Sequence, residues 1–112
     1  MINTLKSRKD FLRIRDYGLK SVCKALILQA APNDDNTIKR FGFTATRKIG
    51  NAVTRNRAKR RLRALVQINY KEQFNNGMDY VLIARNETAK RDFHKLNQEL
   101  LSAISYVSKK LN

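Results

Sequence analysis

The sequence has little of what a protein catalyst usually requires. Its 112 residues contain no tryptophan, one proline, one cysteine (Cys23) and one histidine (His94). A lone cysteine excludes an intramolecular disulfide and a cysteine-rich zinc site. A nucleophilic pair would have to join Cys23 to His94, and nothing in the residues around either one supports that pairing. Cys23 lies in an apolar stretch, where a free thiol usually behaves as a small core residue.

Long apolar runs are absent as well. None approaches the roughly 18 residues that a membrane-spanning helix requires. Residues 1–10 mix charges with isolated apolar residues and do not resemble a signal peptide. We therefore expect a cytoplasmic protein without a membrane partner. Apolar residues make up 42% of the sequence and are spread along it, which predicts a single domain over residues 1–112 with one core.

Acidic residues are scarce. The chain carries 24 Lys and Arg against 9 Asp and Glu, a formal net charge of +15. A field of this strength attracts polyanions, and the release of counterions from phosphates favours binding of nucleic acid. A basic surface kept only for solubility is the main alternative, although acidic residues serve solubility better. A membrane-surface helix would need bulky apolar anchors, and the apolar residues here are needed for a core.

Turn-forming residues divide the chain into six expected elements. In order they are a helix at 8–17, strands at 21–31 and 37–46, a helix at 52–70, a strand at 78–84 and a helix at 88–111. Ser7 and Asp10 are expected to form a capping box at the first helix, which Gly18 ends. The turn at 32–36, which includes Asp34 and Asp35, is expected to join the first two strands into an antiparallel hairpin.

Helical spacing predicts which faces of the two long helices are buried. The second helix has a mostly apolar face of Ala58, Leu62, Leu65, Val66 and Asn69. The last helix has one of Phe93, Leu96, Leu100, Ile104, Val107 and Leu111. Together the elements predict an α+β two-layer sandwich, in the order α-β-β-α-β-α, with the helices packed on one small mixed sheet.

The densest positive charge falls on the second helix and just before it, where no acidic residue occurs between Asp35 and Glu72. On a helix, the face opposite the apolar stripe carries Asn56, Lys59, Arg60 and Arg63. Arginine binds phosphate oxygens two at a time and stacks on bases, and Asn56 could bond a base or a 2′-hydroxyl. A solvated face normally mixes both signs, so this pattern favours RNA binding.

Other chemistry has few candidate residues. The sequence shows no cluster of carboxylates at metal-ligand spacing, no Ser/His/Asp set and no glycine-rich phosphate loop. Phe41 and Phe43 share one face of the strand at 37–46. Such residues either belong to the core or, if exposed beside the basic helix, stack on unpaired bases.

The run from Phe41 to Arg63 resembles the signature of bacterial ribonuclease P protein subunits. The hallmark is an Arg-Asn-Arg helix, here Arg55–Arg57, preceded by Lys-Ile-Gly-Asn-Ala-Val, here Lys48–Val53. Similarity extends to Lys9–Phe11 and Asp79–Arg85 and covers nearly the whole chain. The resemblance implies a ribosomal protein S5 domain 2-like fold. It also implies a left-handed β-α-β crossover through the basic helix, where the general rule predicts a right-handed one.

The resemblance implies a function. Proteins of this family assist an RNA subunit that removes the 5′ leader from precursor tRNA as an endoribonuclease. We accordingly expect ribonuclease P RNA and precursor tRNA as partners, and Mg²⁺ held mainly by the RNA as the cofactor. We expect no small-molecule substrate and no catalytic residue on this chain.

Motif matching assigns individual positions. The residues expected to bind RNA are Arg47, Lys48, Asn51, Arg55, Asn56, Arg57, Lys59, Arg60 and Arg63. A cleft for the leader, formed by the sheet and the first two helices, is expected to involve Phe11, Arg15 and Phe43. Arg15 stands where relatives commonly have a second aromatic residue, and Gln29 where some have a tyrosine. Stacking on the leader is therefore expected to be weaker here.

Three rival functions share part of this pattern. A ribosomal or general RNA-binding protein would share the charge but would not need the Lys48–Arg57 run. A metal-dependent nuclease acting alone is disfavoured by the scarcity of acidic residues. A DNA-binding helix-turn-helix is disfavoured because the basic helix follows a strand rather than a first helix.

Overall fold

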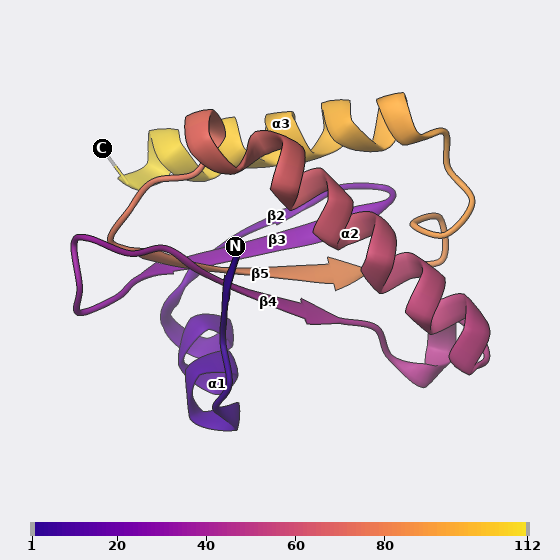
Figure 1. Cartoon of the computed structure of the whole chain (residues 1–112), viewed down its shortest axis with the longest axis horizontal. Coiled ribbons are helices and arrows are strands. Elements are labelled where there is room, and N and C mark those ends of the chain that lie inside the picture. The colour runs from indigo at the N-terminus through magenta and orange to yellow at the C-terminus, as the bar shows by residue number, and fades with distance from the viewer. Residues whose placement is uncertain (1, 112) are drawn as a thin grey trace.

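A five-stranded mixed sheet organises residues 2–111, the part of the chain that this computed structural model describes (Figure 1). The helices are α1 (Arg8–Tyr17), α2 (Ala52–Gln73) and α3 (Phe93–Leu111), with a 3₁₀ turn, η1 (Arg47–Ile49), before α2. The strands are β1 (Asn3–Thr4), β2 (Leu19–Val22), β3 (Leu26–Pro32), β4 (Arg40–Thr44) and β5 (Met78–Ala84). The α+β class and the predicted order are confirmed, with the first predicted strand divided in two and β1 added. Within these residues no helix has the length and apolarity to cross a bilayer.

The order of strands in the sheet is β1-β4-β5-β3-β2. β5 runs parallel to β4 and antiparallel to β3. The predicted hairpin between residues 21–31 and 37–46 is therefore wrong, because β5 lies between the two strands. The turn at residues 32–36 does reverse the chain, but turn chemistry carries no information about which strand fills the place beside β3.

The hairpin that does form spans the residues predicted as one strand at 21–31 and extends slightly beyond them. The chain bends at residues 23–25, where the Cys23 N–H donates to the Leu26 carbonyl at 2.9 Å. β2 and β3 then pair from Leu19 opposite Ala30 to Val22 opposite Ile27. The bend contains neither glycine nor proline, so the usual turn signals were missing. Cys23 is half-buried against the core, and burial raises the pKa of its thiol, in agreement with a packing role.

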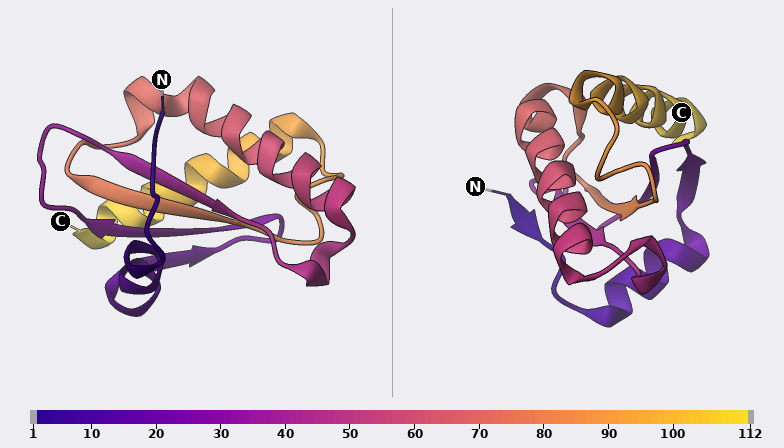
Figure 2. Two further views of the ribbon diagram at one scale, coloured as in Figure 1. Left: turned by 60° about the horizontal axis from the view of Figure 1, so that its bottom comes forward. Right: turned by 90° about the vertical axis from the view of Figure 1, so that its right-hand side faces the viewer.

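The helices divide unequally between the two faces of the sheet. Figure 2 shows α2 and α3 on one side and α1 alone on the other. The main core lies under α2 and α3, where the Phe41 ring packs edge-on against Phe74 at 4.9 Å and stacks on Tyr80 at 5.5 Å between centroids. A smaller cluster of Leu5, Ile14, Ala31 and Val81 lies under α1. One small helix therefore covers only part of its face.

The buried face of α2 is the predicted one: Ala58, Leu62, Leu65, Val66 and Asn69. The helix continues to Gln73 rather than ending at Tyr70. Lys39 supports the added turn, because its buried ammonium donates to the carbonyls of Tyr70 and, at 3.1 Å, Phe74. A cation at the C-terminal end of a helix stabilises its last turn.

The last helix begins at Phe93 rather than Thr88. Thr88 is buried; its hydroxyl donates to the Ala25 carbonyl and accepts from the Arg85 N–H at 2.8 Å. These bonds hold the segment before α3 against the β2–β3 bend. Because the Thr88 hydroxyl bonds to main-chain groups there, it competes with helix formation at this position. The predicted face of α3 is buried at Leu96, Leu100, Ile104 and Val107, whereas Phe93 is 36% and Leu111 41% exposed.

α2 joins the parallel neighbours β4 and β5 through a left-handed crossover. In Figure 1 both strands run in the same direction with β4 below β5, and α2 returns in front of them. The general preference for a right-handed connection is not followed, and the handedness implied by the family resemblance is confirmed.

Candidate nucleic-acid interface

The solvent side of α2 forms a basic face, defined by Asn56, Lys59, Arg60 and Arg63. With Val53 they line one shallow depression, so the structure brings together the four residues that helical spacing had grouped. Within residues 2–111 no carboxylate pairs with the three cations of this face. Unpaired cations on a rigid helix repel one another until an anion binds.

Three other arginines of α2 are held by main-chain carbonyl groups. Arg55 Nη1 donates to Gly50 at 2.9 Å, and Arg57 Nε donates to Ala89 at 2.9 Å. Arg61 donates through its two terminal nitrogens to Thr88 at 2.7 Å and to Arg91 at 2.5 Å. Each guanidinium keeps further N–H donors after these bonds. Arg55 and Arg57 thus flank the basic face with their directions fixed by the fold.

The segment leading into α2 carries the other predicted RNA contacts. Arg47 and Lys48 are exposed on η1. Gly50 adopts a φ of +141°, a conformation that residues with a Cβ rarely reach. Asn51 is the N-cap of α2, because its side-chain oxygen accepts from the Thr54 N–H at 2.9 Å. The side-chain N–H groups of Asn51 and one lone pair of its oxygen remain available to RNA.

Phe43 does not lie with Phe11. Side chains alternate along β4, so Phe41 and Phe43 point toward α2 and α3, whereas Gly42 faces α1. Phe41 is fully buried, and Phe43 is half-buried with the Arg63 guanidinium carbon 5.4 Å from its ring centroid. Phe11 packs on the opposite face of the sheet. The expected grouping of Phe11, Arg15 and Phe43 around one cleft is corrected accordingly: Phe43 belongs to the side of α2.

The sheet beyond α1 is only partly covered. We call this region the open sheet face; strand alternation places on it Lys20, Val22, Ile27, Gln29, Thr44 and Ile83. Val22 is 56% exposed, and Ile27, Thr44 and Ile83 are half-buried. Phe11 and Arg15, four residues apart, share the side of α1 that borders this region. In Figure 1, α1 lies under one end of the strands and the chain leading from β4 into α2 lies at the other.

The two ends of α1 are fixed by different contacts. At its start, Ser7 Oγ accepts from the Lys9 N–H at 3.1 Å. Asp10 does not complete the predicted capping box; its carboxylate lies 3.6 Å from Arg13 and 3.9 Å from Arg40 instead. Gly18 ends the helix as predicted, and a Cβ there would stand 2.6 Å from the Ala30 carbonyl oxygen. The absence of that Cβ lets α1 approach β3 closely.

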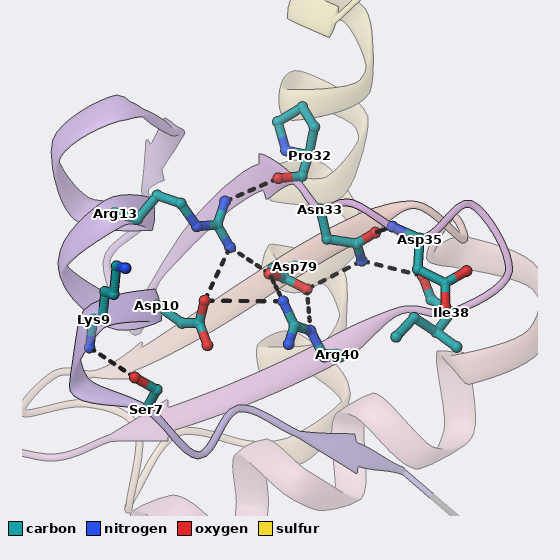
Figure 3. A network of polar contacts seen from close by, with 10 residues as sticks. All are labelled: Ser7, Lys9, Asp10, Arg13, Pro32, Asn33, Asp35, Ile38, Arg40 and Asp79. Atoms are coloured by element: carbon teal, nitrogen blue, oxygen red, sulfur yellow. Dashed lines mark hydrogen bonds and ion pairs between the residues drawn. The ribbon is translucent and has the colours of Figure 1, made fainter.

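Asp79 lies at the centre of a polar network that joins α1 to the sheet (Figure 3). Its buried carboxylate accepts from Arg13 at 2.5 Å, from Arg40 at 2.9 and 2.7 Å, and from Asn33 at 3.1 Å. Burial alone would raise the pKa of Asp79, but the bonds from Arg40, Asn33 and Arg13 outweigh it and hold that pKa below its ordinary value. The charged form therefore stabilises the placement of α1.

Sequence reasoning did not single out Asp79, Arg13 or Arg40. The available signal was a lone aspartate in the otherwise apolar strand at 78–84, because a buried charge requires partners. Nothing local indicates which cations supply them. Arg13 comes from 66 positions before Asp79 and Arg40 from 39 positions before it.

Two further carboxylates, Asp35 and Glu99, accept hydrogen bonds, one within its turn and one across the fold. Asp35 accepts from the N–H and the hydroxyl of Thr37 at 2.9 and 2.6 Å, which lowers its pKa and confirms its turn-forming role. Glu99 accepts from the Ala25 N–H at 2.9 Å. Among residues 2–111, no three His, Cys, Asp or Glu side chains are grouped so that they could hold a metal ion.

Comparisons with known proteins point to one family. A family model described as Ribonuclease P matches residues 2–108. The chain is similar to the Ribonuclease P protein component of Paramagnetospirillum magneticum, with 43% identity over 110 residues that cover 95% of this chain and 83% of the relative. The corresponding protein of Gluconacetobacter diazotrophicus is 46% identical over 96 residues, covering 86% and 83%. The solved structure of the RNase P protein from Thermotoga maritima matches with a TM-score of 0.77 at 30% identity, covering 89% and 93%.

Proposed function

This chain belongs to the ribonuclease P protein family, and on that basis we propose that it binds the catalytic RNA of ribonuclease P and helps to remove the 5′ leader from precursor tRNA. The observation that supports the proposal best is that one small domain carries two separate surfaces. The basic face lies on α2, and the open sheet face lies beside α1 on the other side of the sheet. One protein can thereby hold two RNA segments at once.

The basic face is the surface proposed for the RNA subunit. Lys59, Arg60 and Arg63 project from a helix that is anchored by its buried apolar side, so little order has to be gained on binding. Each phosphate that they neutralise releases counterions, which favours binding and makes it depend on salt. Asn56 adds a donor and an acceptor that can meet a base edge or a 2′-hydroxyl.

The open sheet face is the surface proposed for the leader. Its surface includes half-buried apolar side chains. Phe11 at its border provides an aromatic ring on which a base can stack. Arg15 and Lys20 are exposed beside it and can meet the leader phosphates. Because guanidinium groups also stack on bases, Arg15 partly replaces the aromatic residue that relatives commonly have at this position.

Catalysis is proposed to reside in the RNA, with Mg²⁺ bound mainly by that subunit. Two carboxylates that already have partners within the fold support this division of roles. Asp79 is neutralised by Arg13 and Arg40, and Glu99 accepts from a backbone N–H. On this proposal the chain orients and retains substrate, and the ribonucleoprotein as a whole is the endoribonuclease.

The test is cleavage of precursor tRNA at low Mg²⁺ by three preparations: a bacterial ribonuclease P RNA alone, this protein alone, and both together. We expect cleavage at the mature 5′ end only in the mixture. Cleavage by the protein alone would place the catalytic groups on this chain. No stimulation of a cognate RNA would refute the subunit role and leave a general RNA-binding protein.

A further inference from the structure

Beside the depression on the basic face, a groove lies on the other flank of α2. It runs between α2 and the start of α3 and is lined by Arg57, Arg60, Arg61, Ala64 and Phe93. We call it the α2–α3 groove. Arg60 also lines the depression on the basic face, so its side chain borders both that depression and the α2–α3 groove. Arg61, Ala64 and Phe93 belong to neither surface assigned above.

Two of the three arginines of this groove are held by main-chain carbonyls, and within residues 2–111 no carboxylate pairs with any of the three. Arg57 is bound to the Ala89 carbonyl, and Arg61 is bound to the carbonyls of Thr88 and Arg91. Burial lowers the pKa of Arg61 and the charge of Arg57 lowers it further, against the opposing effect of Asp92. The Asp92 carboxylate accepts from the Lys95 N–H at 3.2 Å at the start of α3. An anion in the groove would relieve the repulsion among these three cations.

Phe93 gives the groove an aromatic wall. Helical spacing places this ring on the buried face of α3, yet it is 36% exposed. The Arg61 guanidinium carbon lies 5.7 Å from its centroid, on a side chain that two carbonyl bonds already fix. An aromatic ring beside fixed guanidinium groups is the arrangement on which nucleic acid bases stack while their phosphates meet the cations.

We propose that the α2–α3 groove binds a second segment of the ribonuclease P RNA, with a phosphate between Arg57 and Arg60 and a base on Phe93. α2 then lies between two RNA segments, with Arg60 reaching both. This inference rests on the proposed function, because it concerns the same RNA partner. It differs from that proposal in requiring contacts on both flanks of one helix.

Directed cleavage of RNA tests the two flanks separately. Cys23→Ala removes the native thiol, and Val53→Cys or Ala64→Cys then carries an iron chelate that generates hydroxyl radicals on the basic face or in the α2–α3 groove. Each labelled protein is assembled with ribonuclease P RNA and precursor tRNA. We expect two separate sets of cleaved nucleotides in the ribonuclease P RNA, one for each position.

The possible failures are distinguishable. No cleavage of that RNA from either position would refute the proposed function. Cleavage from position 53 alone, the same nucleotides from both positions, or cleavage from position 64 only in precursor tRNA would overturn the α2–α3 groove and leave the basic face assigned.

Substitution of the aromatic ring gives an independent measurement. Phe93→Leu keeps an apolar side chain that packs beside α2 but removes the ring, and we expect it to weaken binding of ribonuclease P RNA about five-fold or more. Tyr106→Leu is the matched control, because Tyr106 is another exposed aromatic residue of α3, at 48%, and lies outside the groove. Equal affinities of Phe93→Leu and the unsubstituted protein would overturn the base contact.

Discussion

The ring of Phe11 on α1 lies directly over Gly42 on β4. A Cβ at position 42 would stand 2.5 Å from Phe11 Cζ, and a Leu5 methyl carbon would lie 3.2 Å away. The glycine therefore sets how deeply Phe11 sits at the border of the open sheet face.

Gly42→Ala should displace the Phe11 ring rather than disrupt β4, because the new methyl group meets the end of a side chain. We expect a loss of stability of about 1–3 kcal/mol from overpacking. Affinity for leader-bearing precursor tRNA should fall, while affinity for ribonuclease P RNA should stay the same. Binding assays of the two RNAs measure this, and a parallel loss for both would contradict the assignment.

Phe11→Leu keeps an apolar side chain on α1 but removes the aromatic ring. Base stacking on an aromatic residue contributes about 1–3 kcal/mol, so affinity for precursor tRNA should fall by about five-fold to a hundred-fold. Affinity for mature tRNA should not change. The comparison of leader-bearing and mature tRNA in the assembled ribonucleoprotein decides the matter: equal losses would remove Phe11 from the leader site.

The combined change Lys59→Ala and Arg60→Ala should weaken binding of ribonuclease P RNA and flatten its dependence on salt. Removal of two phosphate contacts reduces the magnitude of the negative slope of log affinity against log salt by about 1.5–2. Lys109→Ala with Lys110→Ala removes the same charge from the far end of α3 and serves as the control. If both pairs change the slope equally, net charge rather than the basic face governs binding.

Asp79→Asn should destabilise the fold in a pH-dependent way. The pKa of Asp79 is lowered in the folded state, so its contribution is present above the unfolded-state pKa, about 3.9 for aspartate, and is lost as pH falls through the folded pKa. At pH 7 we expect a loss on the order of 3 kcal/mol. Denaturant unfolding of both proteins from pH 7 to pH 3 should show the difference shrinking; a constant difference would exclude the charge as its cause.

Asn51 offers a test of capping against RNA contact. Asn51→Ala should lower the free energy of unfolding by about 1 kcal/mol through loss of the bond to Thr54, and Asn51→Ser should restore most of it. Affinity for ribonuclease P RNA should recover with serine if the cap is the main role of Asn51. An affinity that stays low in the stable serine variant would show a direct contact through the Asn51 amide.

Local periodicity predicted the parts of the fold that depend on neighbours in the chain. The buried face of α2 and the grouping of Asn56, Lys59, Arg60 and Arg63 follow from helical spacing alone. The place of β5 between β3 and β4 does not, because strand pairing joins residues far apart in sequence. Thr88 likewise leaves the predicted helix for bonds to Ala25 and Arg85, one of which is tertiary and has no local signal.

The candidate site shows the same division. Alternation on β4 correctly placed Phe41 and Phe43 on a common face. Which face of the sheet receives α1 is decided by tertiary contacts such as Gly18 against Ala30 and Arg13 against Asp79. Phe43 was therefore grouped with the wrong helix. The family motif located the basic residues, but only the structure separates the cations directed at solvent from those, such as Arg57 and Arg61, that are also bound to the segment before α3.

The central position of β5 has a consequence for the growing chain during translation. β4 can pair with β5 only after residues 78–84 have been synthesised, whereas α2 is already complete at residue 73. Until then the apolar side of α2 has only part of the sheet to cover, and its cations are already accessible to RNA. Since non-local pairing is the slow part of folding, an interrupted chain ending at Gln73 would be an incompletely folded polycation rather than a smaller version of the domain.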